Sequence, residues 1–324
     1  MKKPIIRSAT LDDAALASDL MTAAYPAEPE DPVMTAHQWA NNREDYNFGR
    51  FIAEVDGTPV AYLAWAHGPW EKLPERHCYV DLYLDAAHMD DELLTYLWHW
   101  IENEAAEQGA WTLNAATAEE ETHMKAVLER IGFQREREDR VWDLNLERHG
   151  TRLAGEAADA RKVMDRQGIT LTTISEWHDP QRFEKLHRLS NETRQDIPTS
   201  TPIIPQPFEY FMKRIQTPGN RLDRMWIALD GDEPVAMSHL SFPPVRGNVW
   251  TGYTCCARAY RGRGIARAVK LQTLAQAIEL GVTHVRTDND YENAPMLHIN
   301  EKLGYESLPG YVNYVKRLRA RALR

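Results

Sequence analysis

Cysteine is scarce in this 324-residue chain, which has only Cys78, Cys255 and Cys256. An odd number with two adjacent members does not form the disulfide framework of a secreted domain, so we predict a reducing compartment. The chain also lacks the run of about 20 apolar residues that crosses a membrane, and its N-terminus lacks the apolar core of a secretory signal. We therefore expect a cytoplasmic protein with no membrane partner.

Basic residues are fewer than acidic ones, 38 Lys and Arg against 48 Asp and Glu, which gives a net charge of −10. A nucleic-acid partner is not expected, because phosphate backbones attract basic surfaces. The acidity favours a cationic small molecule through electrostatic steering, although solubility alone explains it equally well. The 12 histidines include no H-x-x-x-H pair, and no C-x-x-C occurs, so we expect no metal site.

What the chain does contain is a long internal repeat. The segment "MKAVLERIGFQR", which starts at Met124, matches "MLHINEKLGYES", which starts at Met296, and the same shift carries Gly109 onto Gly281. A slightly larger shift carries the segment "FIAEVDGTPVAYLAW" onto "WIALDGDEPVAMSHL". We predict two copies of one domain, residues 1–147 and 169–324, joined by a polar linker at 148–168 that contains a short helix.

The second copy alternates helices and strands. Its order of strand, glycine turn, helix, strand, helix and strand is typical of the α/β class around a mixed sheet. The expected elements are a strand opening at 169, a helix at 180–193, a hairpin of 226–229 and 234–241, a strand at 249–256, a helix at 265–280, a strand at 283–287, a helix at 294–303 and a strand at 311–316.

The stretch "YRGRGIA", residues 260–266, has the chemistry of an anion site. Glycines at 262 and 264 let an anion approach the backbone, and the following helix presents its N–H groups and positive dipole end. Five basic residues and no acidic one occur from Arg258 to Lys270. The pattern predicts a pyrophosphate site; the alternative is a glycine turn before an ordinary basic helix.

The spacing of this stretch resembles the (Gln/Arg)-x-x-Gly-x-(Gly/Ala) signature of the GNAT acetyltransferase superfamily, with Arg261, Gly264 and Ala266 at the defined positions. Downstream, "TDNDYENAPMLHINEKLGY" resembles the second conserved block of that superfamily. The chain as a whole is similar to the tandem two-domain type, which includes mycothiol synthase-like proteins. This resemblance implies an α/β fold with two GNAT-like domains, each a mixed, mostly antiparallel sheet flanked by helices.

The resemblance also implies one acetyl-coenzyme A per chain, bound to the second copy. Its pyrophosphate is expected on the turn and its pantetheine arm along the preceding strand and the second block. The cofactor-binding residues implied are Thr254, Cys255, Cys256, Arg261, Gly262, Arg263, Gly264, Ile265, Ala266, Asn289 and Asn293.

Direct acetyl transfer to an amine is the implied reaction, and it requires a base, a positioned thioester and a donor to the leaving sulfur. Many family members have a tyrosine where this chain has Asn300. An amide can donate a hydrogen bond but cannot supply a proton, so water or Tyr253 are the alternatives for the acid. His239 is the candidate base, or else a hydrogen-bonded histidine on the sheet.

Two acids and two thiols near the expected site have competing interpretations. Glu192 and Asp196 follow the first helix of the second copy and are candidates for binding a cationic amine, or else they cap a turn. Cys255 and Cys256 are interpreted as small strand residues beside the cofactor and not as nucleophiles, because no basic partner adjoins them.

The first copy lacks the turn. Its counterpart, "AAHMDDELLTYLW" from Ala86 to Trp98, has three acidic residues, no Lys or Arg and no glycine, and Glu121 stands where the second copy has Asn293. We expect this copy to bind no coenzyme A and to shape the acceptor site. Its tryptophans at 65, 70, 98 and 100 are interpreted as core and interface residues.

The leading hypothesis is an acetyl-coenzyme A dependent N-acetyltransferase that acts on a primary amine of a small molecule, with a cationic amine favoured by the chain's charge. A non-catalytic acyl-coenzyme A sensor and a protein or peptide N-acetyltransferase are the alternatives. The sequence leaves the acceptor open, and it is compatible with a monomer or a homodimer.

Overall fold

The computed structural model describes residues 3–318, whose elements follow one order twice, with a long helix between the two rounds. The first half contains β1 (Ile5–Ser8), α1 (Ala14–Ala24), α2 (Pro32–Ala40), β2 (Asn47–Val55), β3 (Thr58–His67), β4 (His77–Leu84), α3 (Asp91–Glu107), β5 (Thr112–Ala118), α4 (Thr122–Arg130) and β6 (Gln134–Asn145). After α5 (Leu146–Arg166), the second half contains β7 (Ile169–Thr173), α6 (Arg182–Arg194), α7 (Phe208–Ile215), β8 (Met225–Asp230), β9 (Glu233–Ser241), β10 (Trp250–Cys256), α8 (Ile265–Glu279), β11 (His284–Asp290), α9 (Ala294–Leu303) and β12 (Glu306–Arg317).

The predicted elements of the second copy all occur, and α9 has the predicted bounds. Two differences have physical causes. The last strand, β12, begins earlier than its apolar alternation suggests, because the segment "ESLPG" at its start already pairs with β6. The helix between the copies, α5, is longer than its expected middle section, because its buried face packs on α8 along most of its length.

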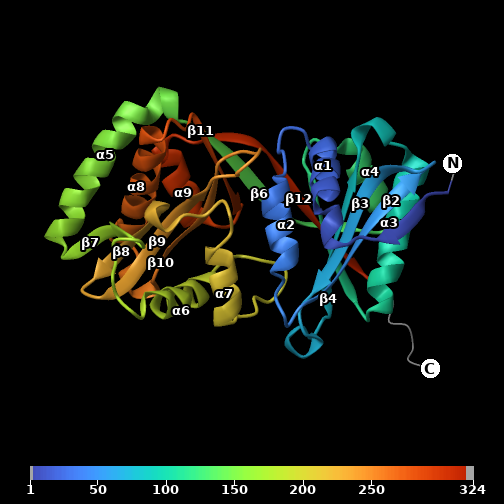
Figure 1. The fold of residues 1–324 in the computed structure, drawn as a ribbon, viewed down its shortest axis with the longest axis horizontal. Helices are drawn as coiled ribbons and strands as arrows, with labels where there is room; N and C mark the ends of the chain where they lie inside the picture. The colour runs from blue at the N-terminus through green and yellow to red at the C-terminus, as the bar shows by residue number, and fades with distance from the viewer. Residues whose placement is uncertain (1–2, 319–324) are drawn as a thin grey trace.

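All twelve strands form one continuous sheet in the order β1-β2-β3-β4-β5-β12-β6-β11-β10-β9-β8-β7 (Figure 1). Neighbours are antiparallel except at β4–β5 and β10–β11. The expected α/β class, with a mixed and mostly antiparallel sheet in each half flanked by helices, is confirmed.

The two halves exchange their last strands. β6, from the first half, pairs with β11, while β12, from the second half, pairs with β5, and the two exchanged strands pair with each other. Figure 1 shows both strands crossing between the halves at the centre of the molecule. Packing follows the exchange, because Val312 and Tyr314 of β12 belong to the first-half core and Trp142 and Leu144 of β6 to a second-half core.

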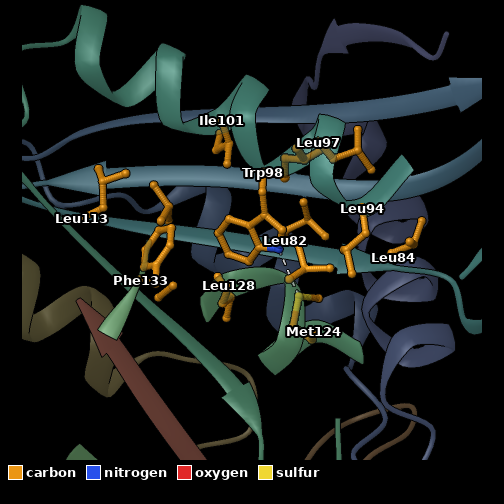
Figure 2. Packing of buried hydrophobic residues seen from close by; sticks show 14 of the residues in the cluster. Leu82, Leu84, Leu94, Leu97, Trp98, Ile101, Leu113, Met124, Leu128 and Phe133 are labelled. Atoms are coloured by element: carbon orange, nitrogen blue, oxygen red, sulfur yellow. Dashed lines mark hydrogen bonds between the residues drawn. The ribbon is translucent and has the colours of Figure 1, made fainter. Parts of the chain in front are cut away.

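The first-half core lies between the sheet and the helices α3 and α4. Trp98 is at its centre and is 1% exposed, and its indole N–H points at the sulfur of Met124, 3.0 Å away (Figure 2). Trp65 is also buried, and Trp70 and Trp100 pack partly buried against the same cluster. These tryptophans therefore contribute to packing, as the sequence predicted.

The loop between the first two helices of each half contacts the other half. In the first half, the carboxylate of Asp31 accepts the backbone N–H groups of Val245 and Arg246, at 2.6 and 3.0 Å, while also capping α2. In the second half, the carbonyl groups of Ile204 and Pro205 accept hydrogen bonds from Arg43. This reciprocal docking holds the halves together above one face of the sheet.

Within residues 3–318, no helix has the length and apolar character to cross a membrane.

Because the strands are exchanged, we predict that a core substitution in β6 destabilises the second half, and that one in β12 destabilises the first half. Leu144→Ala removes a fully buried side chain from the second-half core and should cost about 2–5 kcal/mol. Hydrogen exchange read by mass spectrometry should accelerate in β9–β11 more than in β2–β4. The matched change Val312→Ala should accelerate exchange in β2–β4 instead, and the reverse pattern for either variant would contradict the exchange.

Candidate functional site

The glycine-rich turn joins β10 to the N-terminus of α8. Gly262 and Gly264 have φ of 76° and 81°, in the left-handed region that favours glycine. A Cβ at either position would meet nothing within 4 Å, so the space beside the turn is open. Gly264 is the N-cap of α8, and no side chain caps this helix. The backbone N–H groups of the first turn are therefore free to bind an anion.

Two arginines of the turn are held by acids from the end of α6. Asp196 accepts hydrogen bonds from Arg258 at 2.7 Å and from Arg261 at 2.5 Å, and these guanidinium groups lower the pKa of its carboxyl to about 2. Glu192 accepts the backbone N–H of Arg258 at 3.0 Å. Both acids thus lie beside the turn, where Asp196 positions two guanidinium groups and Glu192 the backbone of Arg258, while their expected part in binding an amine stays a prediction.

The strand before the turn separates from its parallel neighbour. β10 and β11 share one register pair, Trp250 with Arg286, and diverge beyond it. Thr254, whose hydroxyl is 2.9 Å from that of Ser238, lies on the diverging part of β10. The remaining residues expected to bind the cofactor arm lie on β10 and on the far side of the gap, namely Cys255, Cys256, Asn289 on β11 and Asn293 at the N-cap of α9.

The adjacent thiols are protonated. Burial raises the pKa of Cys255 to about 12 and that of Cys256 to about 11. A thiol with such a pKa is a poor nucleophile at neutral pH, because the thiolate is the reactive form. This agrees with their interpretation as small strand residues.

Asn300 belongs to a buried chain of hydrogen bonds. It is 0% exposed, accepts a hydrogen bond from Lys270 at 2.8 Å and donates one to Asn289 at 2.7 Å. The ammonium of Lys270, also 0% exposed, lies 4.8 Å from the ring centre of Tyr305. Burial lowers the pKa of Lys270 to about 7, against a smaller opposing effect of Asp288. Within the protein, the Asn300 oxygen and one of its N–H groups are therefore already engaged.

Sequence reasoning missed Lys270. Helical periodicity places its neighbours Leu271 and Ala268 on the buried face and assigns the lysine to solvent. The sheet on one side and α5 on the other instead enclose α8 over most of its circumference, so the residues from Ala268 to Leu274 are all buried. The signal that could have indicated it is the scarcity of charge from Ala268 to Leu274, where the lysine is the single charged residue.

The two remaining catalytic candidates are register partners on neighbouring strands. Tyr253 on β10 pairs with His239 on β9, and the hydroxyl of Tyr253 lies 2.9 Å from that of Thr193. Burial, and then the charge of Arg214, lower the pKa of His239 to about 4, and its Nδ1 has no hydrogen-bond partner among residues 3–318. His239 is therefore neutral at pH 7 but weakly basic, and its part as a base stays a prediction.

The corresponding turn of the first half is closed by acids. Asp90 is the N-cap of α3, and its side chain accepts the backbone N–H of Leu93 at 2.8 Å. Asp85 caps the short 3-10 helix before it through Ala87 at 2.9 Å. Carboxylates thus occupy the helix N-terminus where the second half has an uncapped glycine.

Comparisons with known proteins agree with this geometry. A model of the acetyltransferase (GNAT) family matches the chain twice, at residues 14–133 and 176–305. A search of curated proteins found no match.

Solved structures share the tandem arrangement over nearly the whole chain. A tandem GNAT protein from the clavulanic acid biosynthesis pathway has a TM-score of 0.73 at 17% identity, over 97% of this chain and 98% of its own. A GCN5-related N-acetyltransferase from Sphaerobacter thermophilus has a TM-score of 0.66 at 19% identity, over 98% and 96%. A GNAT-family acetyltransferase from Colwellia psychrerythraea has 0.60 at 14% identity, over 97% and 100%. At these identities the likeness establishes the fold.

Burial of Lys270 leads to a prediction about stability. Its pKa is lower in the folded chain than in the unfolded one, so the unfolded chain binds more protons between about pH 7 and pH 10. Wild-type stability should therefore rise across this range relative to Lys270→Met, which has no such group. Calorimetric Tm values of both proteins measure the difference. Lys302→Met, at an exposed lysine, is the control. A difference in Tm between the wild type and Lys270→Met that does not vary with pH would contradict the prediction.

Proposed function

Because this chain belongs to the acetyltransferase (GNAT) family, we propose that its second half binds one acetyl-coenzyme A and transfers the acetyl group directly to a primary amine of a small molecule. The observation that carries the proposal is the open, uncapped glycine turn at the N-terminus of α8, which directly follows the strand that diverges from β11. The first half has neither the glycines nor the free helix end.

The residues of the turn fit a pyrophosphate. Positive φ at Gly262 and Gly264 turns successive N–H groups toward the open side, and no protein atom occupies the space where their Cβ atoms would be. Arg263 and Arg261 supply cations beside it, and Asp196 keeps Arg261 oriented before an anion binds. Such preorganised donors cost little ordering when the ligand arrives.

Bound acetyl-coenzyme A would supply an activated acetyl thioester. Residues of β9 and β10 would take the proton of the amine and donate to the leaving sulfur. We infer that Tyr253 is the donor to the leaving sulfur, because its hydroxyl lies on the diverging strand and is oriented by Thr193. Burial raises its pKa, which keeps the phenol protonated and able to donate. Asn300 would hold Asn289 and the second block in place through its buried hydrogen bonds.

The amine must lose a proton before it attacks. His239 lies opposite Tyr253 and is neutral, so it can accept a proton or hold a water that does. Two guanidinium groups act on the space beside His239 and Tyr253. Arg214 lowers the pKa of His239, and Arg194 opposes the increase in the pKa of Tyr253. Their positive charge favours the deprotonated, reactive form of the acceptor amine.

Loss of the turn's donors should weaken cofactor binding. Arg261→Ala removes a charge-assisted hydrogen bond worth about 1.5–3 kcal/mol, so coenzyme A affinity should fall about 10- to 100-fold in calorimetric titration. Gly264→Ala should weaken binding as well, because alanine disfavours the left-handed backbone.

Met89→Ala changes the position that the repeat aligns with Arg261 and serves as the matched control, with unchanged affinity expected. Wild-type protein should bind one coenzyme A per chain. Two equivalents, or full affinity in Arg261→Ala, would refute the placement of the pyrophosphate.

Tyr253→Phe tests the transfer chemistry separately from binding. Removing a general acid should lower kcat about 100-fold, while the KM for acetyl-coenzyme A changes little. Thiol release with a panel of amines measures both, and Tyr96→Phe on α3 is the control. Cofactor binding without thiol release by the wild type on every amine would favour the acyl-coenzyme A sensor over the enzyme.

A further inference from the structure

The first half contains a pocket where its own parallel strands diverge. β4 and β5 pair only from His77 to Tyr79, and a chamber of ≈ 150 Å³ opens beyond that point, between α1, β4, β5 and β12. A second chamber of ≈ 240 Å³ extends over β2 and β3. Both chambers are lined by Met21, Glu30, Asp81 and Tyr83, and together we call them the β4–β5 pocket. A cavity of about 150 Å³ is large enough for a benzene molecule.

Two carboxylates in this pocket have no partner within residues 3–318. Neither the carboxylate of Asp81 nor that of Glu30 makes a hydrogen bond or an ion pair there, although Arg246, which donates to the backbone carbonyl of Glu30, also acts on the Glu30 carboxylate through its charge. Both carboxylates are exposed to solvent at the pocket, and desolvation by the protein around Asp81 raises the pKa of its carboxyl. A third acid, Glu28, also lines the first chamber but accepts a hydrogen bond from Tyr311 and lies 3.8 Å from Arg286. The first chamber has no lysine or arginine in its lining.

A row of aromatic rings lies along the same pocket. Trp39 stacks on Tyr62 with ring centres 5.7 Å apart, and Tyr62 stacks on Tyr83 at 6.0 Å. Tyr25 meets Tyr83 edge to face at 5.8 Å. Aromatic faces attract cations through their quadrupole, most strongly where water is excluded. Carboxylates next to ring faces are the usual surroundings of an organic ammonium group.

The space exists because of a side-chain difference between the repeats. Asp81 pairs with Ala64 across β4 and β3, whereas the second half has Tyr253 and His239 as the corresponding register partners. Alanine and aspartate leave room where tyrosine and histidine fill it. The first half therefore kept the divergence of its parallel strands and has a negatively charged space beside it.

We propose that the β4–β5 pocket binds a small organic cation, with its ammonium group between Asp81 and Glu30 and its hydrocarbon part against the tyrosine and tryptophan rings. A metal ion fits less well, because no three acid, histidine or cysteine side chains of residues 3–318 converge on one point. Arg50, stacked on Trp39 and hydrogen-bonded to Asn42 at 2.8 Å, closes the far end of the second chamber and excludes a second cationic group there.

This site is separate from the proposed transfer site. Four strands, β5, β12, β6 and β11, lie between the two openings, and β5 and β11 form their facing walls. At about 4.8 Å per strand the openings are roughly 15 Å apart. The proposal therefore does not depend on where acetyl-coenzyme A binds, and its test uses no acetyl donor.

Cation binding should weaken as the pH falls from 7 to 5. Desolvation raises the pKa of Asp81 to about 6, inside this range, and also raises that of Glu30, an increase to which Glu28 and Asp31 add and which Arg246 opposes. The tyrosines, the thiol and the arginine that face Asp81 do not change charge there, since the pKa values of the tyrosines and the thiol are raised and the arginine stays cationic. These are Tyr25, Tyr62, Tyr83, Tyr311, Cys78 and Arg50.

The experiment is a calorimetric titration of the full chain with butylamine, 1-butanol and butyrate, which share one hydrocarbon chain and differ in charge. Butylamine should bind at one site at least 10-fold more tightly than 1-butanol, and butyrate should not bind. Asp81→Asn should reduce butylamine affinity at least 10-fold and make it less dependent on pH, since only Glu30 is then left to titrate. Glu107→Gln, on the exposed side of α3, removes the same charge outside the pocket and should leave affinity unchanged.

Thermal unfolding separates lost binding from lost folding. Because the pKa of Asp81 is raised in the folded chain, Asp81→Asn should have a Tm at neutral pH at least equal to that of the wild type, with the difference shrinking toward pH 4 as the wild-type carboxyl protonates. Butylamine that binds no better than 1-butanol, or that binds Asp81→Asn as tightly as the wild type, would overturn the proposal.

Discussion

The exchange of β6 and β12 is the constraint on which both openings of the sheet depend. A strand that leaves its parallel neighbour exposes backbone N–H and C=O groups, which must be paired elsewhere. β11 is paired along its whole length to β6, and β5 to β12, so each can diverge from β10 or β4 without losing order. Each opening therefore has one wall that is stabilised by a strand from the other half, and neither half is complete alone.

On this shared frame the two halves differ mainly in charge and side-chain size. At the helix N-terminus one half has glycine and free amides, and the other has an aspartate that already satisfies them. At the divergent strands, one half has Tyr253 and His239 and the other has Asp81 and Ala64. The second half is consequently suited to an anion beside its turn, and the first to a cation beside its sheet. Under the two proposals, the repeated backbone geometry would serve ligands of opposite charge in the two halves.

The repeat, the α/β class, most elements of the second copy and the open turn were predictable, because periodicity, glycine positions and motif spacing are local properties. The exchange was not, since β6 and β12 are both amphipathic strands that fit either partner, and sequence adjacency favours the wrong one. Lys270 was missed because α8 is enclosed on nearly every side. Asp81 was missed because an acid that alternates with Val80 and Leu82 resembles an ordinary solvent-facing strand residue.

Two ionisable side chains with shifted pKa values, one in each half, illustrate how partners distinguish structural from ligand-directed groups. Desolvation disfavours the charge of both the buried Lys270 and the pocket-lining Asp81. Lys270 has an amide oxygen and an aromatic face within reach, so the protein itself satisfies its ammonium. Asp81 has no such neighbour and opens onto a pocket. A carboxylate that has no partner within residues 3–318 and faces a chamber lined with aromatic rings is explained by our proposal of a cation that comes from outside the protein.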